Sequence, residues 1–176
     1  MRRTHYAAIA VTAAVLFTGT GATYAAGSDV RPAVTHSTLA GTAQPATVTP
    51  PTPGQIAALF DGWNAALATG DPNRVADLYA PGAVLLPTVA SIRTTRAGIV
   101  DYFTKFLESK PVGKIQERYI NILNDTSAID TGLYQFTLTD KDGSKSTINA
   151  RYTYVYELRG GHWLIINHHS SKVPTG

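Results

Sequence analysis

The chain has 176 residues, of which 44% are hydrophobic and 15% are charged, and its formal net charge is +3. It contains no cysteine, which excludes a disulfide framework, a thiol nucleophile, a lipid-modified cysteine and a cysteine metal site. No cluster of lysine and arginine could follow a phosphate backbone, so we expect no nucleic-acid partner.

The first 26 residues have the layout of a secretory signal peptide. Arg2 and Arg3 precede an apolar run from Ala7 to Phe17, and small residues follow, so we expect cleavage after Ala25 or Ala26. The run is short for a bilayer span, which predicts a secreted protein, extracellular or periplasmic, without a stable membrane anchor. Loss of the two arginines would leave 13 basic against 12 acidic residues, a nearly neutral mature chain.

The segment 27–53 is rich in Ala, Thr, Val, Pro and Ser and has almost no large apolar residue. Such a composition cannot build a core, so we interpret this segment as a disordered or polyproline-like tether. The remaining residues, 54–176, are enough for one domain with one hydrophobic core.

Three helices are predicted at the start of this domain, over residues 53–69, 72–80 and 95–110. The first follows a capping box, Thr52-Pro53-Gly54-Gln55, and Asp71 or Thr94/Thr95 can cap the other two. Each helix carries a stripe of apolar side chains at helical spacing. In the first helix the stripe consists of Ile56, Leu59, Phe60, Trp63 and Leu67.

The rest of the domain is predicted to be a sheet. After a short strand at 83–86, the hydrophobic period changes to two, and four strands follow at 114–123, 128–139, 147–159 and 162–170. Turns of the type NDTS, KDGS and GG join these four strands. The predicted fold class is therefore α+β, with three helices packed on a strongly curved antiparallel meander that forms a cone with a cavity.

The last two strands form a hairpin around Gly160-Gly161, a pair suited to a type I′ turn. This turn predicts a tyrosine-rich face on which Tyr156 lies opposite Ile165, Tyr154 opposite Asn167, and Tyr152 opposite His169. Both faces of the hairpin are apolar. We therefore expect helices or a cavity to cover one face and a second sheet or subunit to cover the other.

The segment LATGDPNRVADLYAPGAVLLP between two helices, and the ending GGHWLIINHHSS, resemble the nuclear-transport-factor-2-like superfamily, also called the cystatin-like cone fold. The ending is similar to bacterial relatives of the calcium/calmodulin-dependent protein kinase II association domain and to SgcJ/EcaC proteins. This resemblance implies a cone with a cavity and a homo-oligomer, a dimer or larger. The chain lacks the Gly-rich loop, HRD and DFG sequences of a kinase.

Two residues are candidates for acid or base chemistry. His168 and His169 point to opposite faces of a strand, so they cannot share a metal ion, and we expect neither a metal nor a cofactor. His169 is preferred because the predicted register places it with Asn167 on the tyrosine-rich face. Asp130, at the same parity as Tyr134, could reach the same cavity. A hydrogen-bonded histidine and a solvated aspartate are the structural alternatives.

The resemblance also bears on the cavity itself. The kinase association domain has cavity arginines that bind small carboxylates, and their positions fall on Tyr134, Tyr154 and Ser170, none of which is cationic. Arg151 could replace one charge only if a β-bulge turned it inward. A two-residue Asp142-Gly143 loop pairs Tyr134 with Arg151, whereas a bulge at Gly143 puts Tyr134 on the face of Tyr154, and we favour the bulge.

We favour a non-catalytic function: a secreted homo-oligomer that binds a small ligand in the cone. The alternative is a cavity enzyme similar to SgcJ/EcaC or SnoaL, an isomerase, cyclase or oxidoreductase that uses His169 or Asp130 as acid or base. The candidate ligand-binding residues are Tyr134, Arg151, Tyr152, Tyr154, Asn167, His169, Ser170 and Trp63.

Overall fold

The computed structural model of the protein describes residues 49–174. The predicted signal peptide, and the predicted tether up to residue 48, lie outside the described residues. None of the helices in the described part is long and apolar enough to cross a membrane.

Three helices open the fold, as predicted. Helix α1 (Pro53–Ala68) begins at the capping box, in which Gln55 donates its backbone N–H to the Thr52 hydroxyl and accepts the Thr52 N–H. Asp71 caps α2 (Pro72–Ala76), and Thr95 caps α3 (Arg96–Phe106). A single 3₁₀ turn, η1 (Leu107–Ser109), follows α3.

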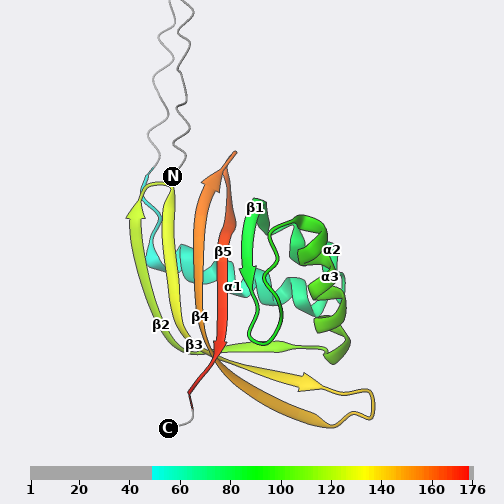
Figure 1. The fold of residues 1–176 in the computed structure, drawn as a ribbon. Helices are drawn as coiled ribbons and strands as arrows, with labels where there is room; N and C mark the ends of the chain where they lie inside the picture. The colour runs from blue at the N-terminus through cyan, green and yellow to red at the C-terminus, as the bar shows by residue number, and fades with distance from the viewer. Residues whose placement is uncertain (1–48, 175–176) are drawn as a thin grey trace, which may run out of the picture. The chain divides into compact units, whose positions relative to one another are not determined.

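Five strands form one sheet in the order β1-β5-β4-β3-β2 (Figure 1). The predicted meander is confirmed, because each of its four strands pairs antiparallel with the next one along the chain. These strands are β2 (Val112–Asn124), β3 (Ser127–Thr139), β4 (Lys145–Arg159) and β5 (His162–Lys172). The first strand, β1 (Tyr79–Leu86), lies parallel to β5, so the sheet is mixed.

Strand β1 is longer than the predicted strand 83–86 and includes Pro81 and Gly82. The pairing of β1 with β5 shifts register between Tyr79 and Val84, and Gly82 has a φ of 77°. A bulge of this kind accepts a proline and a left-handed residue within a strand. Tyr79 thereby belongs to the sheet and not to the second helix, where the sequence pattern placed it.

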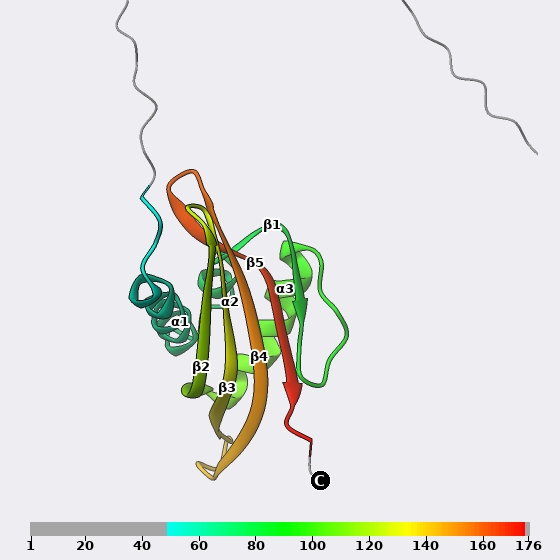
Figure 2. The same ribbon diagram turned by 90° about the vertical axis from the view of Figure 1, so that its left-hand side faces the viewer.

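The helices pack on one face of the curved sheet, and α1 runs across the strands (Figures 1 and 2). The tyrosine-rich face of β4 points toward them: Tyr152, Tyr154 and Tyr156 are each 2% exposed or less. Phe60 and Trp63 of α1 pack against these rings, with Trp63 5.8 Å from Tyr154 between ring centroids. Aromatic side chains from α1 and the sheet therefore make up a large part of the core.

The β4–β5 hairpin begins as predicted and then departs from the predicted register. Gly160 and Gly161 both have positive φ, and Tyr156 pairs with Ile165. The pairing then shifts by one residue, so that Tyr154 pairs with His168 and Tyr152 with Ser170. The predicted pairs of these tyrosines with Asn167 and His169 were wrong, because a β-bulge at Ile166 exchanges the two faces of the rest of β5.

The β3–β4 hairpin has the bulge that we favoured. Gly143 has a φ of 84° and donates its N–H to the Asp140 carbonyl at 2.9 Å. Tyr134 consequently pairs with Ala150 and shares the face of Tyr152, whereas Arg151 pairs with Leu133 and is exposed on the opposite face. A bulge that turns Arg151 inward does not occur.

Candidate functional site: a pocket between helix α3 and the sheet

A pocket of about 620 Å³ lies between α3, the loop 87–95 and the helix-covered face of the sheet. Its walls include Trp63 of α1, Phe103 and Phe106 of α3, and Phe136 of β3. Its polar groups come from the loop 87–95, from α3 and from the sheet, where His168, Ser170 and Lys172 of β5 follow one another on the same face. Aromatic walls with a few placed polar groups are typical of sites for small organic molecules.

His168 is a deeply buried ionisable group in the pocket wall, with 3% of its surface exposed. Its Nδ1 lies 2.8 Å from the Tyr79 hydroxyl, which accepts the indole N–H of Trp63 at 3.2 Å. Its Nε2 is buried and has no hydrogen-bond partner among the described residues. Burial, with a smaller effect from His169, lowers the pKa of His168 from 6.5 to about 3, so the ring is neutral at physiological pH.

A row of hydroxyl groups lies beside His168. Tyr134 donates its O–H to Ser170 Oγ at 2.6 Å, and Ser170 Oγ lies 2.5 Å from Thr88 Oγ1. Burial raises the pKa of the Tyr134 phenol far above 10, so this group stays protonated. The inner part of the pocket thus presents neutral hydrogen-bonding groups.

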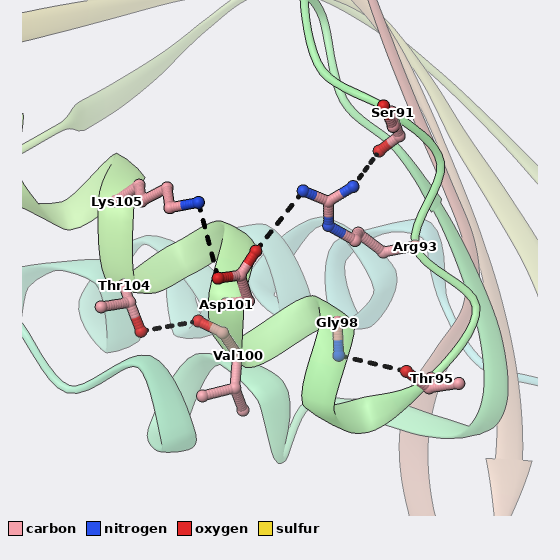
Figure 3. A network of polar contacts seen from close by, with 8 residues as sticks. All are labelled: Ser91, Arg93, Thr95, Gly98, Val100, Asp101, Thr104 and Lys105. Atoms are coloured by element: carbon pink, nitrogen blue, oxygen red, sulfur yellow. Dashed lines mark hydrogen bonds and ion pairs between the residues drawn. The ribbon is translucent and has the colours of Figure 1, made fainter.

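The rim of the pocket carries the positive charges. Arg93 lies 3.5 Å and Lys105 3.6 Å from the Asp101 carboxylate, and Arg93 also donates to the Ser91 carbonyl (Figure 3). Lys172 is exposed at the same rim and forms no ion pair with any described residue. Three cations and one carboxylate make the entrance positively charged.

A second polar cluster lies in the core under α1, away from the pocket lining. Asp130 is fully buried, accepts the Tyr152 O–H at 2.8 Å, and lies 3.3 Å from Arg118 Nε. The Arg118 guanidinium lies over the Phe60 ring, 5.7 Å from its centroid. Burial raises the pKa of Asp130, and the Tyr152 hydrogen bond and the Arg118 charge oppose that rise.

The structure brings only part of the predicted site together. Trp63, Tyr134 and Ser170 line the pocket. Tyr152 and Tyr154 lie on the same face but are packed in the core behind it, and Tyr154 stacks on His168 at 4.1 Å between centroids.

Three of the predicted ligand-binding residues lie on the wrong face for this pocket. His169 and Arg151 are exposed, and Asn167 pairs with Val155, on the face that the helices do not cover. Asp130 and His169 therefore cannot act as the predicted acid–base couple, because the sheet separates them. The bulge at Ile166 causes this error for the two β5 residues.

Sequence reasoning missed His168, Tyr79, Thr88 and Arg118. For His168 a signal was present: the family resemblance placed Ser170 with Tyr154 in one cavity, which requires His168 on that face as well. Among the described residues no group of three His, Asp or Glu side chains could hold a metal ion.

Comparisons with known proteins identify the fold and the family of the chain. Residues 53–174 match the family model described as calcium/calmodulin dependent protein kinase II association domain. A crystal structure of a candidate association domain of this type from Xanthomonas campestris is 61% identical, with a TM-score of 0.68, and the match covers 69% of this chain and 87% of that one. None of the curated proteins compared with the chain matches it.

More distant solved structures share the fold. The association domain of the C. elegans kinase is 11% identical with a TM-score of 0.56, and the match covers 68% of this chain and 94% of that one. A candidate dehydratase of the nuclear-transport-factor-2-like family from Streptomyces avermitilis is 13% identical with a TM-score of 0.62, over 69% of this chain and 97% of that one. At these identities the likeness concerns the fold alone.

Proposed function

The chain belongs to the calcium/calmodulin-dependent protein kinase II association domain family, and from this premise we propose that it is a secreted, homo-oligomeric module that binds a small, largely apolar ligand. The observation that carries the proposal is the pocket beside α3, with aromatic walls, neutral polar groups in its inner part and three cations at its rim. The leader-like residues 1–26 support export.

Self-association is supported by the sheet face that the helices leave uncovered. Ile129 and Val155 lie opposite each other there, Leu133 lies on the same face four residues further along β3, and all three are half-buried in the single chain. A face of this kind on a central part of a sheet is typical of surfaces that a second subunit covers. The name of the matched family, an association domain, points to the same property.

The catalytic alternative keeps one of its two candidate residues. Asp130 is buried with a raised pKa, as an acid or base in a cavity requires, and a distant structural neighbour is described as a candidate dehydratase. However, Asp130 does not line the pocket, and its carboxylate is engaged by Tyr152 and Arg118. We therefore place ligand binding ahead of acid–base catalysis.

The binding proposal is tested with the full chain and a neutral fluorescent dye, Nile red. Ala90→Trp adds a large side chain at the pocket mouth, and Ala65→Trp adds the same side chain at an exposed position of α1 outside the lining. We expect saturable dye binding that Ala90→Trp weakens at least several-fold and Ala65→Trp leaves unchanged. Equal binding by both variants, or no binding at all, would contradict the proposal.

Self-association is tested separately by native mass spectrometry of the full chain. We expect a dimer or larger, and Val155→Lys should shift the mass toward the monomer, because a lysine ammonium cannot be buried unpaired at an interface. Lys at the exposed position 147, Thr147→Lys, is the control on the same strand. A wild-type monomer would remove the oligomeric part of the proposal.

A further inference from the structure

One buried polar atom in the pocket wall has no partner. His168 Nε2 is enclosed, and no described group forms a hydrogen bond with it. A buried nitrogen left in this state loses its hydrogen bond to water without gaining another, so unpaired atoms of this kind are uncommon in folded proteins. His168 lines the pocket, but Nε2 itself has almost no accessible surface, so a ligand supplies the missing partner only if the pocket wall shifts to open a path to this atom.

The hydrogen bonds behind the ring determine which partner fits. The Trp63 indole N–H can only donate, so the Tyr79 oxygen accepts that bond. The single proton of the Tyr79 hydroxyl then has one acceptor within reach among the described residues, His168 Nδ1. With Nδ1 as acceptor, the proton of the neutral imidazole is on Nε2, and His168 holds a buried, unpaired N–H.

The opposite tautomer leaves more groups unpaired. If Nδ1 carried the proton and donated it to Tyr79, the buried Tyr79 hydroxyl proton would have no acceptor among the described residues. Burial raises the pKa of Tyr79 well above 10, so this hydroxyl cannot avoid the penalty by losing its proton. Full satisfaction of the Trp63–Tyr79–His168 chain therefore favours Nε2–H.

The direction of this N–H is fixed by packing. The His168 ring stacks on Tyr154 at 4.1 Å with an interplanar angle of 25°, and it meets the Trp63 ring edge-on at 5.6 Å. Two aromatic contacts and one hydrogen bond restrain the ring before any ligand arrives, which is the condition for a selective donor.

The charges around the pocket limit what the donor can bind. The three cations at the pocket, Arg93, Lys105 and Lys172, are at its rim, whereas the inner groups beside His168 are hydroxyls. A carboxylate placed at His168 would lose its hydration without a counter-charge, which is unfavourable. A neutral carbonyl oxygen needs only the N–H.

We propose, building on the proposed binding function, that the pocket selects largely apolar molecules that carry a neutral carbonyl oxygen, which accepts the Nε2–H of His168. Trp63 and Tyr79 are positioning residues in this account: they set the tautomer and do not touch the ligand's oxygen. The site thereby distinguishes a ketone or amide from a hydrocarbon of the same shape.

The test compares two probes on the full chain, 2-acetylnaphthalene and 2-ethylnaphthalene, each measured by displacement of Nile red. The wild type should bind the ketone about 3- to 10-fold more tightly than the hydrocarbon, the factor that corresponds to one hydrogen bond. His168→Phe should bring the ratio to about one, while His168→Gln, whose amide can donate from a similar position, should keep part of the preference. His162→Phe, at the exposed hairpin turn, is the matched control.

The outcomes separate this inference from the function on which it rests. If both probes bind the wild type equally, the carbonyl selection is wrong and pocket binding stands. If neither probe displaces the dye, and the dye binds the pocket variants as tightly as the wild type, both proposals are contradicted.

A second measurement does not depend on the folding of any variant at position 168. Nitrogen NMR of wild-type protein labelled in histidine reports which ring nitrogen carries the proton. We expect Nε2–H for His168, with a mixture of tautomers in Tyr79→Phe. A proton on Nδ1 of wild-type His168 would overturn the inference.

Discussion

The same face of the sheet carries two buried polar clusters that differ in kind. Around His168 every group is neutral, and the one unpaired nitrogen lies in the wall of a pocket. Around Asp130 the groups form an ion pair with Arg118, supported by the Tyr152 hydroxyl, outside the pocket lining. Both clusters keep buried atoms without a hydrogen-bond partner among the described residues: Asp130 Oδ2 with two Arg118 nitrogens in one, and His168 Nε2 in the other. The difference is that the first cluster compensates charge within the core, whereas the second is neutral and lies in a pocket wall.

The largest effect should come from the charged cluster. Asp130→Asn removes the partner charge of Arg118, whose side chain is 23% exposed, so we expect a loss of about 2 to 3 kcal/mol in the free energy of unfolding. Urea denaturation measures it. Because Asp130 does not line the pocket, dye affinity in the folded variant should be unchanged. A variant as stable as the wild type, or one that loses dye binding while folded, would contradict the claim that the Asp130 cluster stabilises the fold without taking part in binding.

The next effect is a loss of folding stability at acid pH, which arises from His168. Its pKa is about 3 in the folded protein against 6.5 ordinarily, so above pH 6.5 neither state binds this proton. Below pH 6.5 the unfolded chain takes it up and the folded protein does not. The folded state therefore loses about 1.4 kcal/mol per pH unit down to about pH 3.

This slope is isolated by subtraction. His168→Gln lacks the titrating ring, so the difference in unfolding free energy between wild type and variant should fall by about 2 to 3 kcal/mol from pH 6.5 to pH 4.5. Asp130 and the other carboxyl groups are present in both proteins and cancel in the difference. A constant difference across this range would show that His168 takes up a proton in the folded state.

The smallest effect compares two buried tyrosines. Tyr79→Phe removes a hydroxyl that pairs with Trp63 and His168, and we expect a loss of about 1 to 2 kcal/mol. Tyr156→Phe removes a buried hydroxyl that has no partner among the described residues, so its effect on stability should be near zero or slightly favourable. Thermal or urea unfolding of the pair decides the point, and equal losses would contradict the hydrogen-bond chain behind His168.

Most of the fold could be predicted from the sequence because its signals are local. The capping box at Thr52 and the turn at Gly160-Gly161 each fix an element by residues a few positions apart, and both are confirmed. The parallel pairing of β1 with β5 joins segments about 80 residues apart, and no local pattern encodes it. Pro81-Gly82, read as the end of a helix, lies within that strand.

The site was harder to predict because it depends on a single bulge. Ile166 lies among apolar residues with no glycine to mark an irregularity. Regular alternation through Ile166 therefore predicted His169 on the cavity face, whereas the bulge places His168 there. Arg118 was missed for a different reason: it lies in a polar stretch typical of an exposed strand, and its burial depends on Asp130 and Phe60, which are distant in sequence.

The most direct test is to titrate the histidine-labelled full chain with 2-acetylnaphthalene and to follow the ring nitrogens by NMR. The account predicts that the His168 Nε2 resonance shifts with saturation, and that 2-ethylnaphthalene shifts it less, while His162 and His169 on the surface do not respond. A response centred on His169, or none at His168 with the ketone bound, would contradict the account.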